Sequence, residues 1–127
     1  MKPAKPVPTD LELDILKVVW QRGQATVREV YQDLLKQRKI AYTTVLTIMG
    51  ILEHKGRLKK TAGERAYVYS PAQPQAQVMD TMVKEFVDRV FDGAAQPLLV
   101  HLVERSRIGP EELDQLEDLV RKRRAKP

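Results

Sequence analysis

The first half of the chain places its hydrophobic residues at helical spacing in three successive segments. In the first segment, Thr9 and Glu12 stand three residues apart, which is the spacing of a capping box, so a helix is expected to begin here and to end at Gly23. The apolar positions between them follow the periodicity of a helix that buries one face. They are Leu11, Ile15, Leu16, Val18, Val19 and Trp20.

A second capping box, formed by Thr26 and Glu29, opens the next segment. It is followed by apolar residues at the i, i+3, i+4, i+7 and i+8 positions, with polar residues on the opposite face. These apolar residues are Val27, Val30, Tyr31, Leu34 and Leu35. The helix is expected to end among the cations of residues 36–39, which the helix dipole favours at a C-terminus.

The third predicted helix runs from Tyr42 to Lys55, just before Gly56, and has an unusual polar face. Its core stripe consists of Val45, Ile48, Met49 and Leu52. The other face carries small, hydroxylated or slim residues, where a merely solvated helix would normally carry Glu and Lys. These are Tyr42, Thr43, Thr44, Leu46, Thr47, Gly50 and His54. Threonine and glycine weaken a helix, so this face is not optimised for stability and indicates the close approach of a partner.

Two short strands, residues 57–61 and 66–70, are predicted next, joined by a glycine-containing turn. Three helices followed by a basic hairpin are typical of a winged helix-turn-helix, whose third helix enters the major groove of DNA. The predicted fold is mainly α with a small β-hairpin. It consists of a flexible N-terminal arm (1–8), a winged-helix DNA-binding domain (9–71) and a three-helix dimerisation region with a basic tail (72–127).

The region after residue 75 is helical again but too apolar for a helix with a single partner. Gly93, Gly109 and Pro110 divide it into three helices. About fifty residues rarely close a core alone, so these helices are expected to pack against a second copy in a homodimer. The residues predicted for this interface are Met79, Met82, Val83, Phe86, Val90, Phe91, Leu98, Leu99, Leu102, Leu113, Leu116 and Leu119.

Composition narrows the functional classes. The chain has 127 residues, of which 43% are hydrophobic and 31% charged, as in a folded domain. It has no cysteine, which excludes disulfides and cysteine nucleophiles, and its two histidines make a poor metal site. No catalytic constellation stands at a recognisable spacing, so no enzyme activity, cofactor, metal or small-molecule substrate is predicted. Without a long apolar run or a leader-like start, a cytoplasmic location is expected.

The net charge of +5 favours an anionic partner, and the charges are segregated along the chain. Residues 1–70 hold 13 Lys or Arg against 7 Asp or Glu, residues 71–120 hold 4 against 10, and residues 121–127 add 5 cations. The first half is therefore expected to bind the phosphates of double-stranded DNA, an interaction that weakens steeply with salt. The predicted backbone contacts are Thr26, Arg28, Lys55, Arg57, Lys59, Lys60 and Arg65.

Base recognition is assigned to the exposed face of the third helix. Threonine offers a hydroxyl to donors or acceptors and a methyl group to the methyl of thymine. The predicted base contacts are Tyr42, Thr43, Thr44, Leu46 and Thr47. This helix has no Arg, Asn or Gln, so discrimination per base is expected to be modest and to depend also on dimer spacing and DNA shape.

Several alternatives stay open at this point. Any single cation fits an ordinary solvated surface, and the threonines fit a tight crossing of two helices. The basic tail fits a DNA contact or a dipole-stabilised helix end. Tyr67 and Tyr69 are expected to pack the hairpin against the helices rather than to stack on bases. A winged domain that binds proteins, or DNA without sequence preference, is the rival function, but a protein-docking face would carry large apolar anchors.

Four segments of the sequence resemble the penicillinase-repressor family of the BlaI and MecI type. They read TDLELDIL at 9–16, ATVREVYQDL at 25–34, AYTTVLTIMGILEHKG at 41–56 and GERAYVYSP at 63–71. The AYTTVLT opening of the third helix and the RAYVYSP strand are the most specific. Copper-responsive relatives carry a cysteine-rich tail, which this chain lacks.

This resemblance implies a dimeric transcriptional repressor that binds palindromic promoter DNA through its winged domain. It also implies release from DNA in many members, when a membrane sensor-protease system leads to cleavage at an Asn–Phe step in the fifth helix. The matching step in this chain is His101–Leu102.

Overall fold

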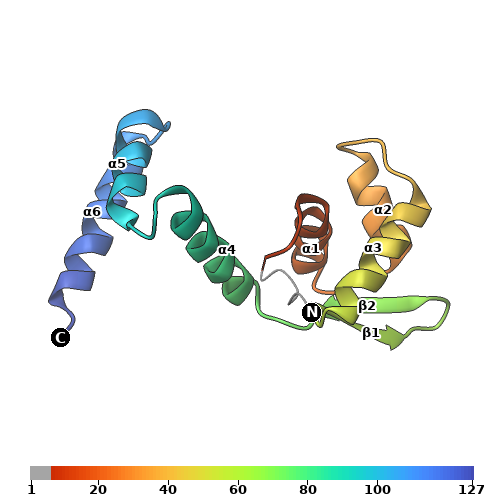
Figure 1. Cartoon of the computed structure of the whole chain (residues 1–127). Helices are drawn as coiled ribbons and strands as arrows, with labels where there is room; N and C mark the ends of the chain where they lie inside the picture. The colour runs from red at the N-terminus through yellow and green to blue at the C-terminus, as the bar shows by residue number, and fades with distance from the viewer. Residues whose placement is uncertain (1–6) are drawn as a thin grey trace. The chain divides into compact units, whose positions relative to one another are not determined.

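The computed structural model describes residues 7–127 and contains six helices and one hairpin within that range (Figure 1). In chain order these are α1 (Asp10–Arg22), α2 (Val27–Leu35), α3 (Tyr42–His54), β1 (Leu58–Ala62), β2 (Tyr67–Pro71), α4 (Gln75–Val90), α5 (Ala95–Arg105) and α6 (Pro110–Ala125). The predicted fold, mainly α with a small β-hairpin, is confirmed. The chain divides into two units, Met1–Val83 and Lys84–Pro127, so the structural boundary lies inside α4.

Both predicted capping boxes are present and set the starts of α1 and α2. The Thr9 hydroxyl accepts from the Glu12 amide at 3.2 Å, and the Glu12 carboxylate accepts from the Thr9 amide at 2.8 Å. Thr26 and Glu29 make the equivalent pair of bonds at 3.2 and 2.9 Å. Each box satisfies two backbone N–H groups that the helix itself cannot.

The ends of these helices are also defined by local geometry. Gly23 follows α1 with a φ of +84°, a left-handed conformation that glycine adopts without strain. The second helix ends at Leu35, earlier than predicted, and a turn follows. Leu35, predicted as part of the apolar stripe, is 44% exposed because only the row of Val27, Val30 and Leu34 faces the core.

The core of the first unit lies between α1, α2, α3 and the hairpin. Its largest fully buried side chains come from all three helices and from β1, and burying each contributes about 1.5 to 3 kcal/mol. They are Ile15, Leu16, Met49, Leu52, Leu58, Val19, Val30 and Val45. Trp20 packs against this core and is partly buried, in line with its predicted place.

The hairpin is antiparallel and pairs Leu58 with Pro71 and Ala62 with Tyr67. Both strands begin and end one residue later than predicted. The segment before α2 extends this sheet through Ala25, which is fully buried. Its N–H donates to the Tyr69 carbonyl at 2.9 Å, and the Tyr69 N–H donates to the Ala25 carbonyl at 2.8 Å.

Of the predicted N-terminal arm (1–8), residues 1–6 lie outside the described residues. Val7 is half-buried and Pro8 is buried, so the packed part of the chain begins earlier than predicted. Within residues 7–127, no helix has the length and apolar character needed to cross a bilayer.

Helices α5 and α6 bury no residue within the single chain, although both are rich in leucine. Most of the residues predicted for the dimer interface are exposed, among them Phe86 (39%), Leu99 (58%), Leu116 (41%) and Leu119 (60%). The basic tail belongs largely to α6, whose last turn contains Lys122, Arg123 and Arg124. A single copy thus leaves most of the apolar residues of α5 and α6 exposed to solvent.

Candidate nucleic-acid interface

Helix α3 divides cleanly into a buried face and an open face. Val45, Met49 and Leu52 are 0% exposed and anchor the helix in the core. Thr43, Thr44 and Thr47 are exposed, and Leu46 is 46% exposed. The threonines are therefore not covered by a helix crossing within this chain, and they form a solvent-facing surface of hydroxyl and methyl groups.

A groove of about 550 Å³ lies between the starts of α2 and α3 and the hairpin. It brings together residues from three segments that are far apart in the sequence. Its lining residues are Thr26, Val27, Arg28, Tyr42, Leu46, Arg65, Ala66, Tyr67 and Tyr69. Five of the residues predicted to contact DNA share this groove, namely Thr26, Arg28, Tyr42, Leu46 and Arg65.

Tyr42 lies at the first position of α3 and contacts two residues of α2. Its ring meets that of Tyr31 edge-on, with centroids 5.6 Å apart and planes at 83°. The Arg28 guanidinium carbon lies 5.8 Å from the Tyr42 ring centroid, within the range of a cation–π interaction.

The hairpin carries two further predicted cations on its first strand. Lys59 and Lys60 are exposed on β1, and the Lys60 ammonium lies 4.3 Å from the centroid of the Tyr67 ring. Tyr67 was expected to pack the hairpin against the helices, and this is wrong because it is 56% exposed, whereas Tyr69 is 4% exposed. The difference follows from position: Tyr69 pairs with Lys60 and Ala25 near the helices, whereas Tyr67 pairs with Ala62 beside the hairpin turn.

Two of the predicted backbone contacts, Arg57 and Lys55, bind polar side chains from distant parts of the chain. Arg57 donates to the Gln73 side chain at 3.4 Å. The Lys55 ammonium lies 3.0 Å from the Glu12 carboxylate, which is almost fully buried. Lys55 follows the last residue of α3, so this ion pair ties the end of α3 to the start of α1.

The Glu12 carboxyl is ionised despite its burial. Burial alone raises its pKa, but the Thr9 amide and the Lys55 ammonium stabilise the charged form, and the net result is a pKa below the ordinary value. The carboxylate has two roles, since one oxygen caps α1 and the other binds Lys55.

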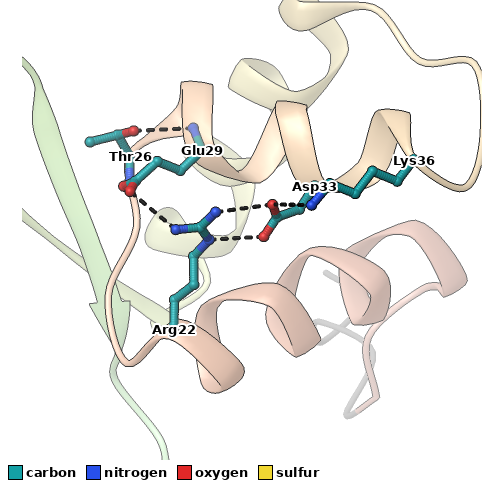
Figure 2. A network of polar contacts seen from close by, with 5 residues as sticks. All are labelled: Arg22, Thr26, Glu29, Asp33 and Lys36. Atoms are coloured by element: carbon teal, nitrogen blue, oxygen red, sulfur yellow. Dashed lines mark hydrogen bonds and ion pairs between the residues drawn. The ribbon is translucent and has the colours of Figure 1, made fainter.

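A second polar network fixes α2 against α1 (Figure 2). The Arg22 guanidinium binds both oxygens of Asp33, at 2.8 and 3.0 Å, and reaches Glu29 at 3.2 Å. This pairing lowers the pKa of the Asp33 carboxyl and raises the pKa of Arg22. Because Glu29 also caps α2, the network joins the end of α1 to the start of the helix that carries Arg28.

Sequence reasoning missed this network and the Lys55–Glu12 pair. The Arg22–Asp33 and Lys55–Glu12 partners are 11 and 43 residues apart and belong to different helices or their ends, so no local spacing indicates them. No group of three or more His, Asp or Glu in the described part of the chain could hold a metal ion.

Comparison with known proteins identifies relatives over most of the chain. Residues 8–122 match the family described as "Penicillinase repressor". The "Transcriptional regulator BlaI" of Mycobacterium tuberculosis is 33% identical over 109 residues, covering 84% of this chain and 78% of that protein. The "Penicillinase repressor" of Bacillus licheniformis is 25% identical over 108 residues, covering 85% and 84%.

Two solved structures also align with this chain. The B. licheniformis BlaI monomeric form in complex with the blaP half-operator aligns with a TM-score of 0.50 and 28% identity, over 59% of this chain and 89% of that chain. A mutant of E. coli MarR complexed with operator DNA aligns with a TM-score of 0.53 over 91% of this chain and 74% of that chain. At 14% identity, the MarR alignment shows a shared fold alone.

Proposed function

The chain belongs to the penicillinase repressor family of operator-binding transcriptional repressors, and from this premise we propose that two copies bind one palindromic promoter site together. A palindrome presents the same half-site twice, so it matches a protein with two-fold symmetry. Each copy would place α3 in the major groove and its hairpin along the phosphate backbone. As a repressor the protein acts by binding, not by catalysis.

The observation that carries the proposal is the open threonine face of α3 beside the groove with its cations. Thr43, Thr44, Leu46 and Thr47 are proposed to contact bases, since their hydroxyl and methyl groups match base edges in the major groove. Thr26, Arg28, Arg57, Lys59, Lys60 and Arg65 are proposed to contact phosphates. We propose that Lys55, which is paired with Glu12, instead holds the end of α3 in place.

We propose residues 9–71 as the DNA-binding domain and residues 72–127 as the dimerisation region. The exposed apolar residues of α4, α5 and α6 support this, because extensive exposed apolar surface marks a protein interface. Release by a membrane sensor-protease system stays a prediction from the family. The step at the matching place in α5, His101–Leu102, is exposed but differs from Asn–Phe.

The proposal is tested with duplexes that the wild-type protein selects from a random pool, titrated against scrambled duplexes at several salt concentrations. Tighter binding to the selected palindrome supports a specific repressor, and equal binding to both contradicts it. Thr47→Glu places a carboxylate on the reading face and is expected to weaken operator binding at least about tenfold while the dimer stays intact.

Thr47→Val is the matched control, because it keeps the shape and a methyl group without adding a charge. It should retain more affinity than Thr47→Glu, with an unchanged sedimentation coefficient. Unchanged operator affinity in the Thr47→Glu protein would remove α3 from DNA recognition.

A further inference from the structure

The ring of Tyr42 lies between an anchor in the core and a cation at the protein surface. Tyr31, which packs against the hydrophobic core, meets the Tyr42 ring at 5.6 Å. On the outer side, the Arg28 guanidinium lies 5.8 Å from the Tyr42 centroid. Arg28 and Tyr31 are three residues apart on α2, so they share one face of that helix.

Within the described part of the chain, no acidic side chain forms an ion pair with Arg28. Arg22 and Arg38, by contrast, each bind a carboxylate. Arg28 also stands in the first turn of α2, where a cation opposes the helix dipole. The position at the helix start is mildly unfavourable in the free protein, and an anion that approaches the start of α2 would interact favourably with both the guanidinium and the helix dipole.

A guanidinium held against an aromatic ring keeps its N–H groups free at its edge, where they can bind a phosphate in bidentate fashion. Arg28 and Tyr42 line the same groove as Arg65 of the hairpin turn. In this place an arginine that is already oriented loses less side-chain entropy on binding than one that moves freely.

We propose that Tyr42 is a positioning residue, which holds Arg28 toward a phosphate of the operator backbone and does not itself read a base. The inference rests on the proposed function. It assigns the work of Tyr42 to its ring and leaves base recognition to Thr43, Thr44, Leu46 and Thr47. The proposal therefore predicts that DNA binding depends on the ring of Tyr42 and not on its phenol oxygen, which is the atom that a direct contact with DNA would use.

The experiment is a double-mutant cycle on the full-length dimer and its selected palindrome, with Tyr42→Phe, Tyr42→Leu, Arg28→Ala and Tyr42→Leu/Arg28→Ala. Tyr42→Phe keeps the ring face and should bind within about twofold of the wild type. Tyr42→Leu should weaken binding about two- to fivefold for each copy bound, the range of an exposed cation–π contact. Arg28→Ala should reduce the slope of log K against log salt by about 0.9 per copy.

The decisive comparison is the effect of Tyr42→Leu on operator affinity in the wild type and in the Arg28→Ala variant. The proposal expects no further weakening in the Arg28→Ala background, and an undiminished effect there would overturn it. Equal losses in Tyr42→Phe and Tyr42→Leu would also overturn it, because they would assign the contact to the hydroxyl. If Tyr42→Leu lowers the melting temperature, Tyr42→Phe alone still decides between ring and hydroxyl. Failure of the wild type to prefer the palindrome would instead refute the proposed function.

Discussion

Replacing Lys55 with methionine is expected to destabilise the winged domain by about 2 kcal/mol at pH 7. The substitution removes the ammonium that lies 3.0 Å from the Glu12 carboxylate, whose side chain is only 3% exposed. Breaking a fully buried pair costs about 3 to 5 kcal/mol. The expected loss of about 2 kcal/mol is below this range because Glu12 keeps its bond to the Thr9 amide and the Lys55 side chain is 29% exposed.

The loss should depend on pH in a defined direction. In the wild type the pKa of Glu12 lies below its ordinary value of 4.5, so the stabilisation is complete above pH 4.5 and disappears as the pH falls through the lower value of the folded state. Without Lys55, burial of the carboxyl is less well compensated and the pKa of Glu12 rises. The difference in stability between wild type and Lys55→Met should therefore shrink between pH 7 and pH 4.

Urea denaturation at pH 7, 5.5 and 4 measures this difference, and Trp20, the single tryptophan, reports on the core. Glu12→Gln provides the second arm, since glutamine can still accept from the Thr9 amide without a charge. It should destabilise the wild type but recover about 1 kcal/mol in the Lys55→Met background. Two results together would refute this reasoning. Lys55→Met would lower the free energy of unfolding by the same amount at pH 7 and pH 4, and Glu12→Gln would destabilise the Lys55→Met protein further.

Two more substitutions test the dimer and the hairpin. Leu116→Asp puts a charge on an exposed apolar residue of α6 and is expected to convert the proposed dimer to a monomer in analytical ultracentrifugation; a dimer that persists at micromolar concentration would count against an interface there. Gly63→Ala should lower both operator affinity and melting temperature, because a Cβ would lie 2.5 Å from the backbone carbonyl oxygen of Ala66 and force the hairpin turn to shift. Wild-type affinity in that variant would show that the turn does not approach DNA.

Features set by neighbouring residues could be predicted from the sequence. Thr9 with Glu12, and Thr26 with Glu29, each act within one helical turn, so their spacing was sufficient to locate the starts of α1 and α2. The buried row of α3 could likewise be predicted from the helical spacing of its apolar residues. The residues between them then gave its open threonine face.

Features that depend on the path of the chain could not be predicted. Nothing in the spacing of Lys55 and Glu12 indicates that they meet, and a surface lysine beside a basic hairpin is equally typical of a phosphate contact. Tyr67 and Tyr69 lie two residues apart on one strand, so the sequence pattern does not distinguish them. Which of the two is exposed depends on how far the hairpin extends beyond the helices, and this is known only from the folded structure. The groove around Tyr42 likewise needs three segments in their folded places.

The two backbone hydrogen bonds between Ala25 and Tyr69 make the hairpin mechanically continuous with the segment that leads into α2. They use main-chain atoms, and the side chains of both residues are buried in the core, so the joint is fixed by hydrogen bonding and by packing. Exchanging hairpin tips between relatives, with the register at Tyr69 kept, should thus change the proposed phosphate contacts of the tip while preserving the positions of α2 and α3 relative to the hairpin. This makes the tip a replaceable module for adjusting the affinity of the proposed DNA complex rather than its sequence preference.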